Sequence, residues 1–263
     1  MYTYVTRTRP WVSCCKSLTR REFTDARFHP RSRIPQLRPA TGKTATSPGL
    51  LQHPRLVAGT LRQYSAPTWP AIMGARVMFY PTLGFNVFMK NVSSRRWYDR
   101  IDDTVILGAL PLRSKNVARE MVEKENVKGV IAMNEDYELK HFVTTEEEWI
   151  KLGVETLQLP TVDFTEAPSI DKLEQGVKFI REHGDKGKSV YVHCKAGRTR
   201  SATLVGCYLM HVNKWTPQEA QIFIQTKRPH IIMKDKHFRA MYRYYDKHVK
   251  GQRAGQKLDM SPD

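Results

Sequence analysis

Residues 188–213 contain the pattern that most restricts the fold of this chain. A short apolar run, "KSVYVHC", is followed by the cationic loop "KAGRTR" and then by "RSATLVGCYLMHVN", in which apolar residues occur on nearly all sides of a helix. The first run predicts a buried strand, and the last predicts a helix without a solvent-facing stripe. Such a helix must be covered by other elements, so the sequence places it at the centre of a domain.

The chain from Trp97 onward alternates short apolar runs with amphipathic segments. The runs that predict further strands are 104–111, 127–134 and 154–160. The segments that predict helices are 114–126, 146–153, 169–184, 216–229 and 238–249. Strands that alternate with helices favour an α/β fold in which a mostly parallel sheet is flanked by helices on both faces.

Several helix ends and faces are predicted in detail. Ser114 is a candidate N-cap, and Thr216 with Glu219 forms a capping box. The last helix is expected to bury four side chains at spacings of three and four residues: Phe238, Met241, Tyr245 and Val249. We assign 96–250 to one folded domain and 251–263 to a tail.

The formal net charge of +17 is concentrated near the start of the chain. Residues 1–72 hold ten arginines and two lysines against only Glu22 and Asp25. A segment that is rich in Arg and Ser and poor in acids is typical of a mitochondrial transit peptide, which we assign to 1–64. A solvated basic tail that binds nucleic acid is the alternative.

The end of this leader is also predicted. In "LRQYSAP", Arg62 stands two residues before Tyr64, which resembles the pattern cut by the mitochondrial matrix protease and indicates cleavage after Tyr64. Met73 is an alternative, downstream start.

We interpret 65–95 as a linker and an apolar, membrane-proximal segment. Its part 73–92 is apolar and aromatic, but Arg76 and Pro81 interrupt it and Lys90 closes it. Such a stretch predicts contact with a membrane interface, and a helix packed on the domain's own core is the alternative. The chain has no uninterrupted apolar run of about 18 residues, which argues against a spanning helix.

The cysteines show neither a disulfide framework nor metal-ligand spacing, so we expect reduced thiols and no metal or cofactor. The spacing from cysteine to arginine in the loop after the buried strand is weak evidence by itself, because the leader's "CCKSLTRR" satisfies it twice. Only Cys194 has a strand before it and a helix after it. Cys207, inside the apolar helix, is interpreted as a buried and inert thiol.

Cys194 lies at the carboxyl end of the predicted strand, where open α/β sheets bind ligands. The loop after it leads into a helix N-terminus, whose N–H groups and positive dipole end favour an anion. Gly197 and Ala196 leave room for backbone amides around that anion, and Arg200 offers it two donors. This setting lowers a thiol pKa, and it indicates a thiolate that attacks phosphorus and forms a phosphocysteine.

The stretch "HCKAGRTRS" resembles the HCxxGxxR[ST] signature of the cysteine-dependent protein-tyrosine phosphatase superfamily, and the domain length suits its compact dual-specificity branch. The resemblance implies that Cys194 is the nucleophile and that Arg200 clamps the phosphate and the transition state. It also implies that Ser201 stabilises the leaving thiolate and that His193 orients the loop. The loop positions expected to bind substrate are Lys195, Ala196, Gly197, Arg198, Thr199 and Ser201.

Such enzymes also need a general acid for the leaving oxygen, on a separate upstream loop. "TVDFTEAP" follows the strand predicted at 154–160, so Asp163 is expected at the same edge of the sheet as Cys194. Glu166 is the rival candidate. Asp171 is interpreted as a charge in the first turn of the following helix.

A closer resemblance covers roughly residues 75–245. "FYPT", "WYDRID", "VILGALPLRS", "MNEDYE", "LGVETLQL" and "VHCKAGRTRSAT" together resemble the mitochondrial phosphatidylglycerophosphate phosphatases. This resemblance implies an enzyme at the matrix face of the inner membrane that makes phosphatidylglycerol for cardiolipin synthesis.

The acidic loop of that family, usually Glu-Glu-Tyr-Glu, corresponds here to Glu135, Asp136, Tyr137 and Glu138. The resemblance implies that these residues support the site. Asp136 is one methylene shorter than the family's glutamate, which keeps the charge and alters the reach.

The leading hypothesis is hydrolysis of phosphatidylglycerophosphate by a monomer that binds this anionic phospholipid at the inner-membrane surface. Lys195 and Arg198 favour it, because two further cations suit a headgroup with more than one phosphate; a solvated basic rim is the alternative. The runner-up is a dual-specificity phosphatase acting on phosphotyrosine, phosphoserine and phosphothreonine.

Two further alternatives are an RNA 5′-triphosphatase and a catalytically silent module that binds phosphoinositides or phosphopeptides. The predicted leader and the apolar segment argue against the first, and no nucleic-acid partner is expected. Intact Cys194, Arg200 and Asp163 argue against the second, because a binder needs neither nucleophile nor acid.

Overall fold

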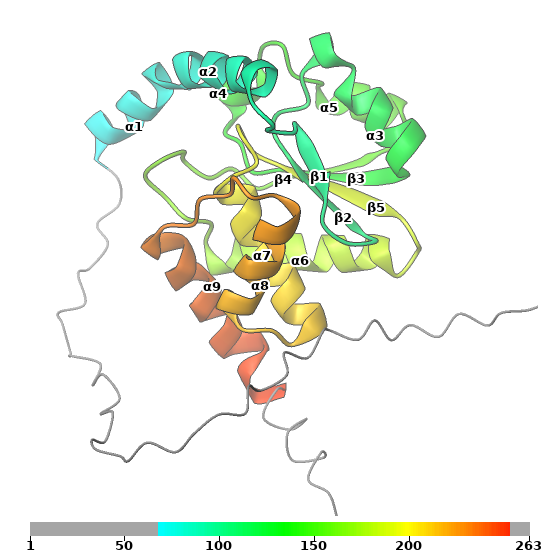
Figure 1. The fold of residues 1–263 in the computed structure, drawn as a ribbon, viewed down its shortest axis with the longest axis vertical. Coiled ribbons are helices and arrows are strands. Elements are labelled where there is room, and N and C mark those ends of the chain that lie inside the picture. The colour runs from blue at the N-terminus through cyan, green and yellow to red at the C-terminus, as the bar shows by residue number, and fades with distance from the viewer. Residues whose placement is uncertain (1–67, 253–263) are drawn as a thin grey trace, which may run out of the picture. The chain divides into compact units, whose positions relative to one another are not determined.

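The computed structural model of the protein describes residues 68–252 (Figure 1). The leader assigned to 1–64, with its cleavage after Tyr64, lies outside the described residues, as do residues 253–263 of the assigned tail.

Five strands form one sheet in the order β1-β2-β5-β3-β4. The strands are Tyr98–Arg100 (β1), Val105–Gly108 (β2), Val127–Ala132 (β3), Glu155–Gln158 (β4) and Ser189–His193 (β5). The last four run parallel to their neighbours, and β1, at one edge, is antiparallel to β2. The predicted, mostly parallel sheet is confirmed. Strand β1 was not predicted, because its three residues are too few for an alternating pattern.

Strand β5 lies in the middle of the sheet and is buried along its whole length. Val190 and Val192 belong to the apolar core on one face, and Tyr191 belongs to the core on the other. Because successive side chains of a strand point to opposite faces, a strand covered on both faces is apolar at nearly every position. Burial of β5 on both faces therefore explains the apolar run "SVYV" in the sequence.

Helices cover both faces of the sheet, as predicted. On the face of Val190 lie α6 (Ile170–Gly184), α7 (Arg200–Asn213), α8 (Pro217–Lys227) and α9 (Asp235–His248) (Figure 1). On the opposite face lie α2 (Phe79–Val92), α3 (Val117–Glu125) and α5 (Glu146–Lys151). The remaining elements are α1 (Trp69–Val77), the 3-10 turn Arg113–Lys115 and α4 (Asp136–Leu139).

Helix α7 is the central helix that the sequence predicts. All residues from Arg200 to Met210 are buried, and α6, α8 and α9 pack against it. Two glycines make this packing close. A Cβ at Gly206 would lie 2.6 Å from Cε of Met241, and one at Gly176 would lie 2.6 Å from Cδ1 of Leu204.

Helix α3 begins later than predicted. Its N-cap is Asn116, which adopts the left-handed conformation, and Ser114 lies in the preceding 3-10 turn. The prediction of Ser114 as N-cap is therefore wrong; Asn is one of the few residues that tolerate a positive φ. The capping box of Thr216 and Glu219 is present as predicted.

The burial of helix α9 confirms two of its four predicted core residues. Met241 and Val249, the residue after the helix, are buried as predicted, whereas Phe238 and Tyr245 are only half-buried. Ala240 and Tyr244 are buried as well. This helix carries four aromatic residues within eight positions, so spacing alone does not determine which of them face the core.

The apolar segment 73–92 forms the end of α1 and all of α2. Phe79 and Leu83 of α2 are buried in the core, whereas Phe85 and Phe88 are 54% and 58% exposed. One face of α2 therefore packs on the domain, and the other presents apolar side chains to the outside. Within residues 68–252, no helix is long and apolar enough to cross a bilayer.

Helix α8 offers a matched test of this packing. Ile224 is fully buried, and Ile222 on the same helix is 61% exposed. Ile224→Ala should lower the free energy of unfolding by about 2–5 kcal/mol, because it leaves a cavity. Ile222→Ala should change it by less than about 0.5 kcal/mol. Urea denaturation followed by circular dichroism measures both values, and equal losses would contradict the placement of α8.

Candidate active site

A pocket of about 220 Å³ opens where β5 ends. It is bounded by the loop 194–200, the loop after β4, one side of α2 and the start of α9. Its lining residues are Thr82, Phe85, Asn86, Asp163, Phe164, Glu166, Cys194, Lys195, Ala196, Arg198, Thr199, Arg200, Ile232, Lys234, Lys236 and His237.

Hydrogen bonds to its carbonyl groups fix the orientation of the backbone in the loop 194–200. The carbonyl oxygens of five consecutive residues accept hydrogen bonds of 2.8–3.5 Å from outside the loop: Lys195, Ala196, Gly197, Arg198 and Thr199. In a trans peptide the N–H points away from the C=O of the same unit. The amides that follow these carbonyls therefore point into the loop's interior, where they form an anion-binding nest.

Arg228 binds the backbone of this loop through hydrogen bonds to two of its carbonyl groups. It is buried, its Nη1 lies 2.6 Å from Asp99, and its other nitrogens donate to the carbonyls of Gly197 and Ala196. Gly197 has a φ of +64°, and a Cβ there would lie 2.3 Å from the carbonyl oxygen of Gly108. Glycine is therefore required at this position, both by conformation and by space.

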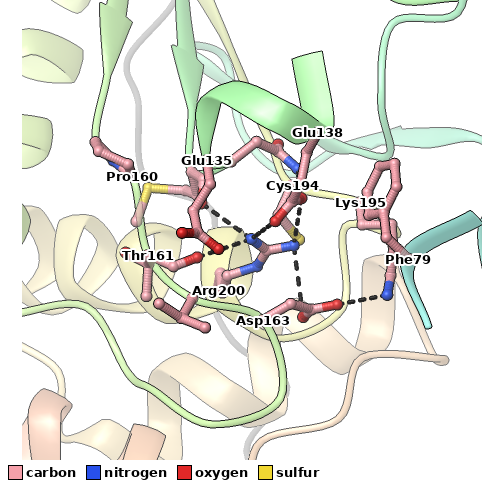
Figure 2. Close-up of polar contacts among 12 residues, drawn as sticks. Phe79, Glu135, Glu138, Pro160, Thr161, Asp163, Cys194, Lys195 and Arg200 are labelled. Carbon is pink, nitrogen blue, oxygen red and sulfur yellow. Dashed lines mark hydrogen bonds and ion pairs between the residues drawn. The ribbon is translucent and has the colours of Figure 1, made fainter. Parts of the chain in front are cut away.

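Arg200, the first residue of α7, is buried at the bottom of the site. Its Nη1 and Nη2 lie 2.8 and 3.0 Å from the two carboxylate oxygens of Glu138, and Nη1 also donates to the carbonyl of Thr161 at 2.8 Å. Its Nη2 is 3.4 Å from Oδ1 of Asp163 (Figure 2). The Nε of Arg200 has no hydrogen-bond partner among residues 68–252, so this donor is available to a substrate oxygen.

Cys194 is buried, and the Ser201 hydroxyl donates a hydrogen bond to its Sγ at 3.2 Å. Burial raises the pKa of the Cys194 thiol, but the charge of Arg200 and the hydrogen bonds from Ser201 outweigh burial, and the pKa is lowered overall. The site therefore favours a nucleophilic thiolate. Burial alone acts on Cys207 and raises its pKa, as expected for an inert thiol.

Asp163 reaches the site from the loop after β4. Its Oδ2 lies 2.5 Å from Nζ of Lys195, and its Oδ1 faces Arg200. Burial raises the pKa of Asp163, but the charges of Arg200 and Lys195, with hydrogen bonds from Lys195 and the Phe164 N–H, lower it overall. Asp163 is thus an anion held by two cations of the Cys194 loop.

Lys195 connects three segments that are far apart in the sequence. Besides Asp163, its Nζ donates to Thr82 Oγ1 of α2 at 2.8 Å and lies 4.2 Å from the ring centre of Phe164. It is only 5% exposed, so the alternative of a solvated basic rim is wrong for Lys195. The role of Thr82 was not predicted from the sequence, because nothing in the spacing of Thr82 relates it to a loop more than a hundred residues away.

The acidic loop contributes Glu138 to the site and directs Asp136 elsewhere. Asn134 donates a hydrogen bond to Glu138 and fixes its carboxylate against Arg200. Asp136 is exposed, and its Oδ1 accepts a hydrogen bond from Gln158 at 2.8 Å. The shorter side chain of Asp136 therefore leaves the contacts of Arg200 unchanged.

The other two residues of the acidic loop face the N-terminal helices. Tyr137 packs edge-on against Phe79, with ring centres 5.6 Å apart, and Arg76 lies over its ring at 5.2 Å. Glu135 lies 3.8 Å from Arg76, and its pKa is raised by partial burial and by the neighbouring Glu138. These contacts join the acidic loop to α1 and α2.

The remaining predicted residues are placed as follows. Glu166 lines the pocket, but its carboxylate accepts a hydrogen bond from the N–H of Val162 at 3.4 Å and makes no ion pair within residues 68–252.

His193 is buried and stacks on Tyr191, and burial followed by the Arg200 charge lowers its pKa to about 3. Its imidazole is therefore neutral. Asp171 lies in the first turn of α6, as predicted.

Comparison with known proteins identifies the class. The family model "Dual specificity phosphatase, catalytic domain" matches residues 114–247. The chain belongs to this family and is a phosphoric monoester hydrolase.

The relatives and solved structures place the chain more narrowly, among PTPMT1-like phosphatases of the dual-specificity branch. The human "Phosphatidylglycerophosphatase and protein-tyrosine phosphatase 1" is 52% identical over 160 residues, which cover 60% of this chain and 79% of the human protein. The Arabidopsis thaliana "Phosphatidylglycerophosphate phosphatase PTPMT1" is 37% identical over 68% of this chain and 51% of that protein.

A solved structure described as PTPMT1 in complex with PI(5)P superimposes with a TM-score of 0.57 at 44% identity. The match covers 60% of this chain and 99% of that one. The predicted superfamily, branch and fold are confirmed.

Ser201→Ala tests the origin of the thiolate. Removing a hydrogen bond to the charged sulfur should raise the pKa of Cys194 and shift its alkylation profile to higher pH. The pH dependence of alkylation by iodoacetamide, resolved by peptide mass spectrometry, measures this shift. Cys207 is the internal reference and should stay unlabelled in both proteins. An unchanged Cys194 profile would mean that Ser201 does not stabilise the thiolate.

Proposed function

We propose that the protein hydrolyses phosphatidylglycerophosphate to phosphatidylglycerol and phosphate through a phosphocysteine intermediate on Cys194. The observation that carries the proposal is the convergence of a lowered thiol pKa, a buried guanidinium and a buried carboxylate in one pocket. The names of the relatives supply the substrate.

In the first step, Sγ of Cys194 forms a bond to phosphorus while the bond from phosphorus to the glycerol oxygen breaks. Arg200 and the amides of the loop hold the phosphate oxygens, where negative charge develops. Asp163 gives a proton to the leaving oxygen. In the second step, water attacks phosphorus, Asp163 takes its proton, and the thiolate leaves with a hydrogen bond from Ser201.

This sequence requires Asp163 to gain a proton when substrate binds. Arg200 and Lys195 hold the pKa of Asp163 low in the free protein. A phosphate dianion competes for the same cations and places like charge beside the carboxylate, and both effects raise its pKa. Binding of the correct dianion therefore activates the acid.

The exposed apolar face of α2 supports contact with a membrane interface. Phe85 lines the pocket and is exposed, and Phe164 and Ile232, from two other segments, are also exposed at the same pocket. Lys234 and Lys236 lie beside them. Apolar and cationic side chains around one opening suit the surface of an anionic bilayer. We place the protein, as a monomer with a cleaved leader, on the matrix side of the mitochondrial inner membrane, in cardiolipin synthesis.

A phosphoprotein phosphatase is the second candidate, because the human relative's name also includes protein-tyrosine phosphatase. The described nucleophile, arginine and acid serve either substrate. A substrate comparison is therefore the deciding experiment.

The test uses the full chain with phosphatidylglycerophosphate in mixed micelles, phosphoinositides and phosphotyrosine peptides. The expected result is the highest kcat/KM for phosphatidylglycerophosphate. Cys194→Ser should abolish turnover and retain phosphate binding, because the loop amides and Arg200 remain. A higher kcat/KM for phosphopeptides would favour the second candidate, and residual turnover by Cys194→Ser would refute the phosphocysteine.

Lys195→Met tests the assignment of the acid. Lys195 stabilises the carboxylate form of Asp163, so its removal should raise the pKa of Asp163 and shift the alkaline limb of the kcat profile to higher pH. Asp163→Asn is the control and should remove that limb. A limb that stays in place in Lys195→Met would show that another group provides the proton.

A further inference from the structure

A second, smaller hollow adjoins the catalytic pocket. The two share Asn86, Ala196 and Arg198, so they are parts of one continuous surface. The second hollow is lined in addition by Lys90 at the end of α2, by Arg95 and Arg96 after it, and by His230 after α8. None of these four residues takes part in the chemistry described above.

The charges around this hollow are not balanced by carboxylates. Five cations line it: Lys90, Arg95, Arg96, Arg198 and Arg228. Within residues 68–252, Asp99 is the one carboxylate that forms an ion pair with any of them, and it is bound by both Arg228 and Arg96. Lys90, Arg95 and Arg198 form no ion pair with a described residue.

Arg198 is fixed at the boundary between the two pockets. Its Nε donates to the carbonyl of His230 at 2.9 Å, and its own carbonyl accepts the N–H of Ile232 at 2.8 Å. The terminal nitrogens of its guanidinium form no hydrogen bond with residues 68–252, and they remain for a ligand. Burial, followed by the charges of Arg228, Arg198, Arg95 and Arg96, lowers the pKa of His230 to about 3. An uncompensated cationic cluster on a concave surface is a site for an anion.

We propose that this hollow is a second anion subsite, which binds the phosphodiester of the same substrate molecule whose phosphomonoester is attacked by Cys194. The inference rests on the proposed function and names the part of the headgroup that the enzyme uses for selection. Phosphatidylglycerophosphate carries a monoester and a diester on one glycerol. Arg198 and Asn86, which line both pockets, lie where that glycerol would bridge them.

The subsite gives a physical reason for substrate selection. Guanidinium groups bind phosphate oxygens through paired, charge-assisted hydrogen bonds. A phosphotyrosine side chain has no second phosphate and leaves these cations without an anion. The subsite therefore favours a headgroup with two phosphates over a monophosphate.

Direct binding tests the subsite without turnover. Isothermal titration of the full-length Cys194→Ser protein compares glycerol 1,3-bisphosphate with glycerol 3-phosphate. The bisphosphate carries two phosphates on one glycerol, so its second phosphate stands in for the diester of the substrate, and glycerol 3-phosphate carries one phosphate. Adding Arg95→Ala should weaken binding of the bisphosphate about tenfold and binding of the monophosphate far less. The matched control is Arg119→Ala on the exposed side of α3, which should leave both affinities unchanged.

The stoichiometry separates the two sources of a second phosphate. One bisphosphate and one monophosphate per chain are expected. Two monophosphates per chain, with one lost in Arg95→Ala, would mean that the hollow takes free phosphate and would overturn the assignment to one substrate molecule. Equal weakening of both ligands by Arg95→Ala would also overturn it.

The result is independent of the proposed lipid activity. If the wild-type protein does not hydrolyse phosphatidylglycerophosphate but Arg95 still selects the bisphosphate, the lipid substrate is wrong and the anion subsite stands. If the lipid is hydrolysed and its kcat/KM is the same in Arg95→Ala, the function stands and the subsite is refuted.

Discussion

The buried ion pair between Arg200 and Glu138 is the interaction on which the rest of the site depends (Figure 2). Both side chains are almost completely buried, so each charge depends strongly on the presence of the other. Loss of one partner from such a pair costs about 3–5 kcal/mol. The pair ties the start of α7 to the acidic loop after β3, and it orients the guanidinium so that Nε is left for substrate. The lowered pKa of Cys194 depends on the same charge.

A second constraint is the placement of three charged side chains around one anion position. Asp163 binds Arg200 and Lys195, and Lys195 is in turn anchored to Thr82 of α2. Lys195, which belongs to the Cys194 loop, therefore contacts both the acid Asp163 and the helix α2. The helix α2, which presents an exposed apolar face, is thus in direct contact with Lys195, the residue that binds the acid Asp163. Two contacts, from Thr82 to Lys195 and from Lys195 to Asp163, therefore connect α2 to the carboxylate of Asp163.

The local part of this site could be predicted from the sequence, because strand, loop and helix are contiguous. Cys194 and Asp163 each follow a predicted strand, and Arg200 begins a predicted helix. The structure brings the three residues together. Arg228 could not be predicted in the same way. It follows α8 and binds the carbonyl of Gly197, thirty-one residues away in the chain, and it pairs with Asp99 on a strand too short to recognise. Likewise, the sequence does not single out Arg95, because which carboxylates lie near a cation is known only in three dimensions.

The central claim is that phosphate passes through Cys194 while Arg200 and Asp163 assist. Rapid-quench analysis of the full chain with radiolabelled phosphatidylglycerophosphate tests it most directly, with the labelled peptide identified by mass spectrometry after acid quenching. The account predicts a transient phosphoryl group on the peptide that contains Cys194, formed and lost at rates compatible with kcat. Release of phosphate without that intermediate, or a label on another residue, would contradict the account.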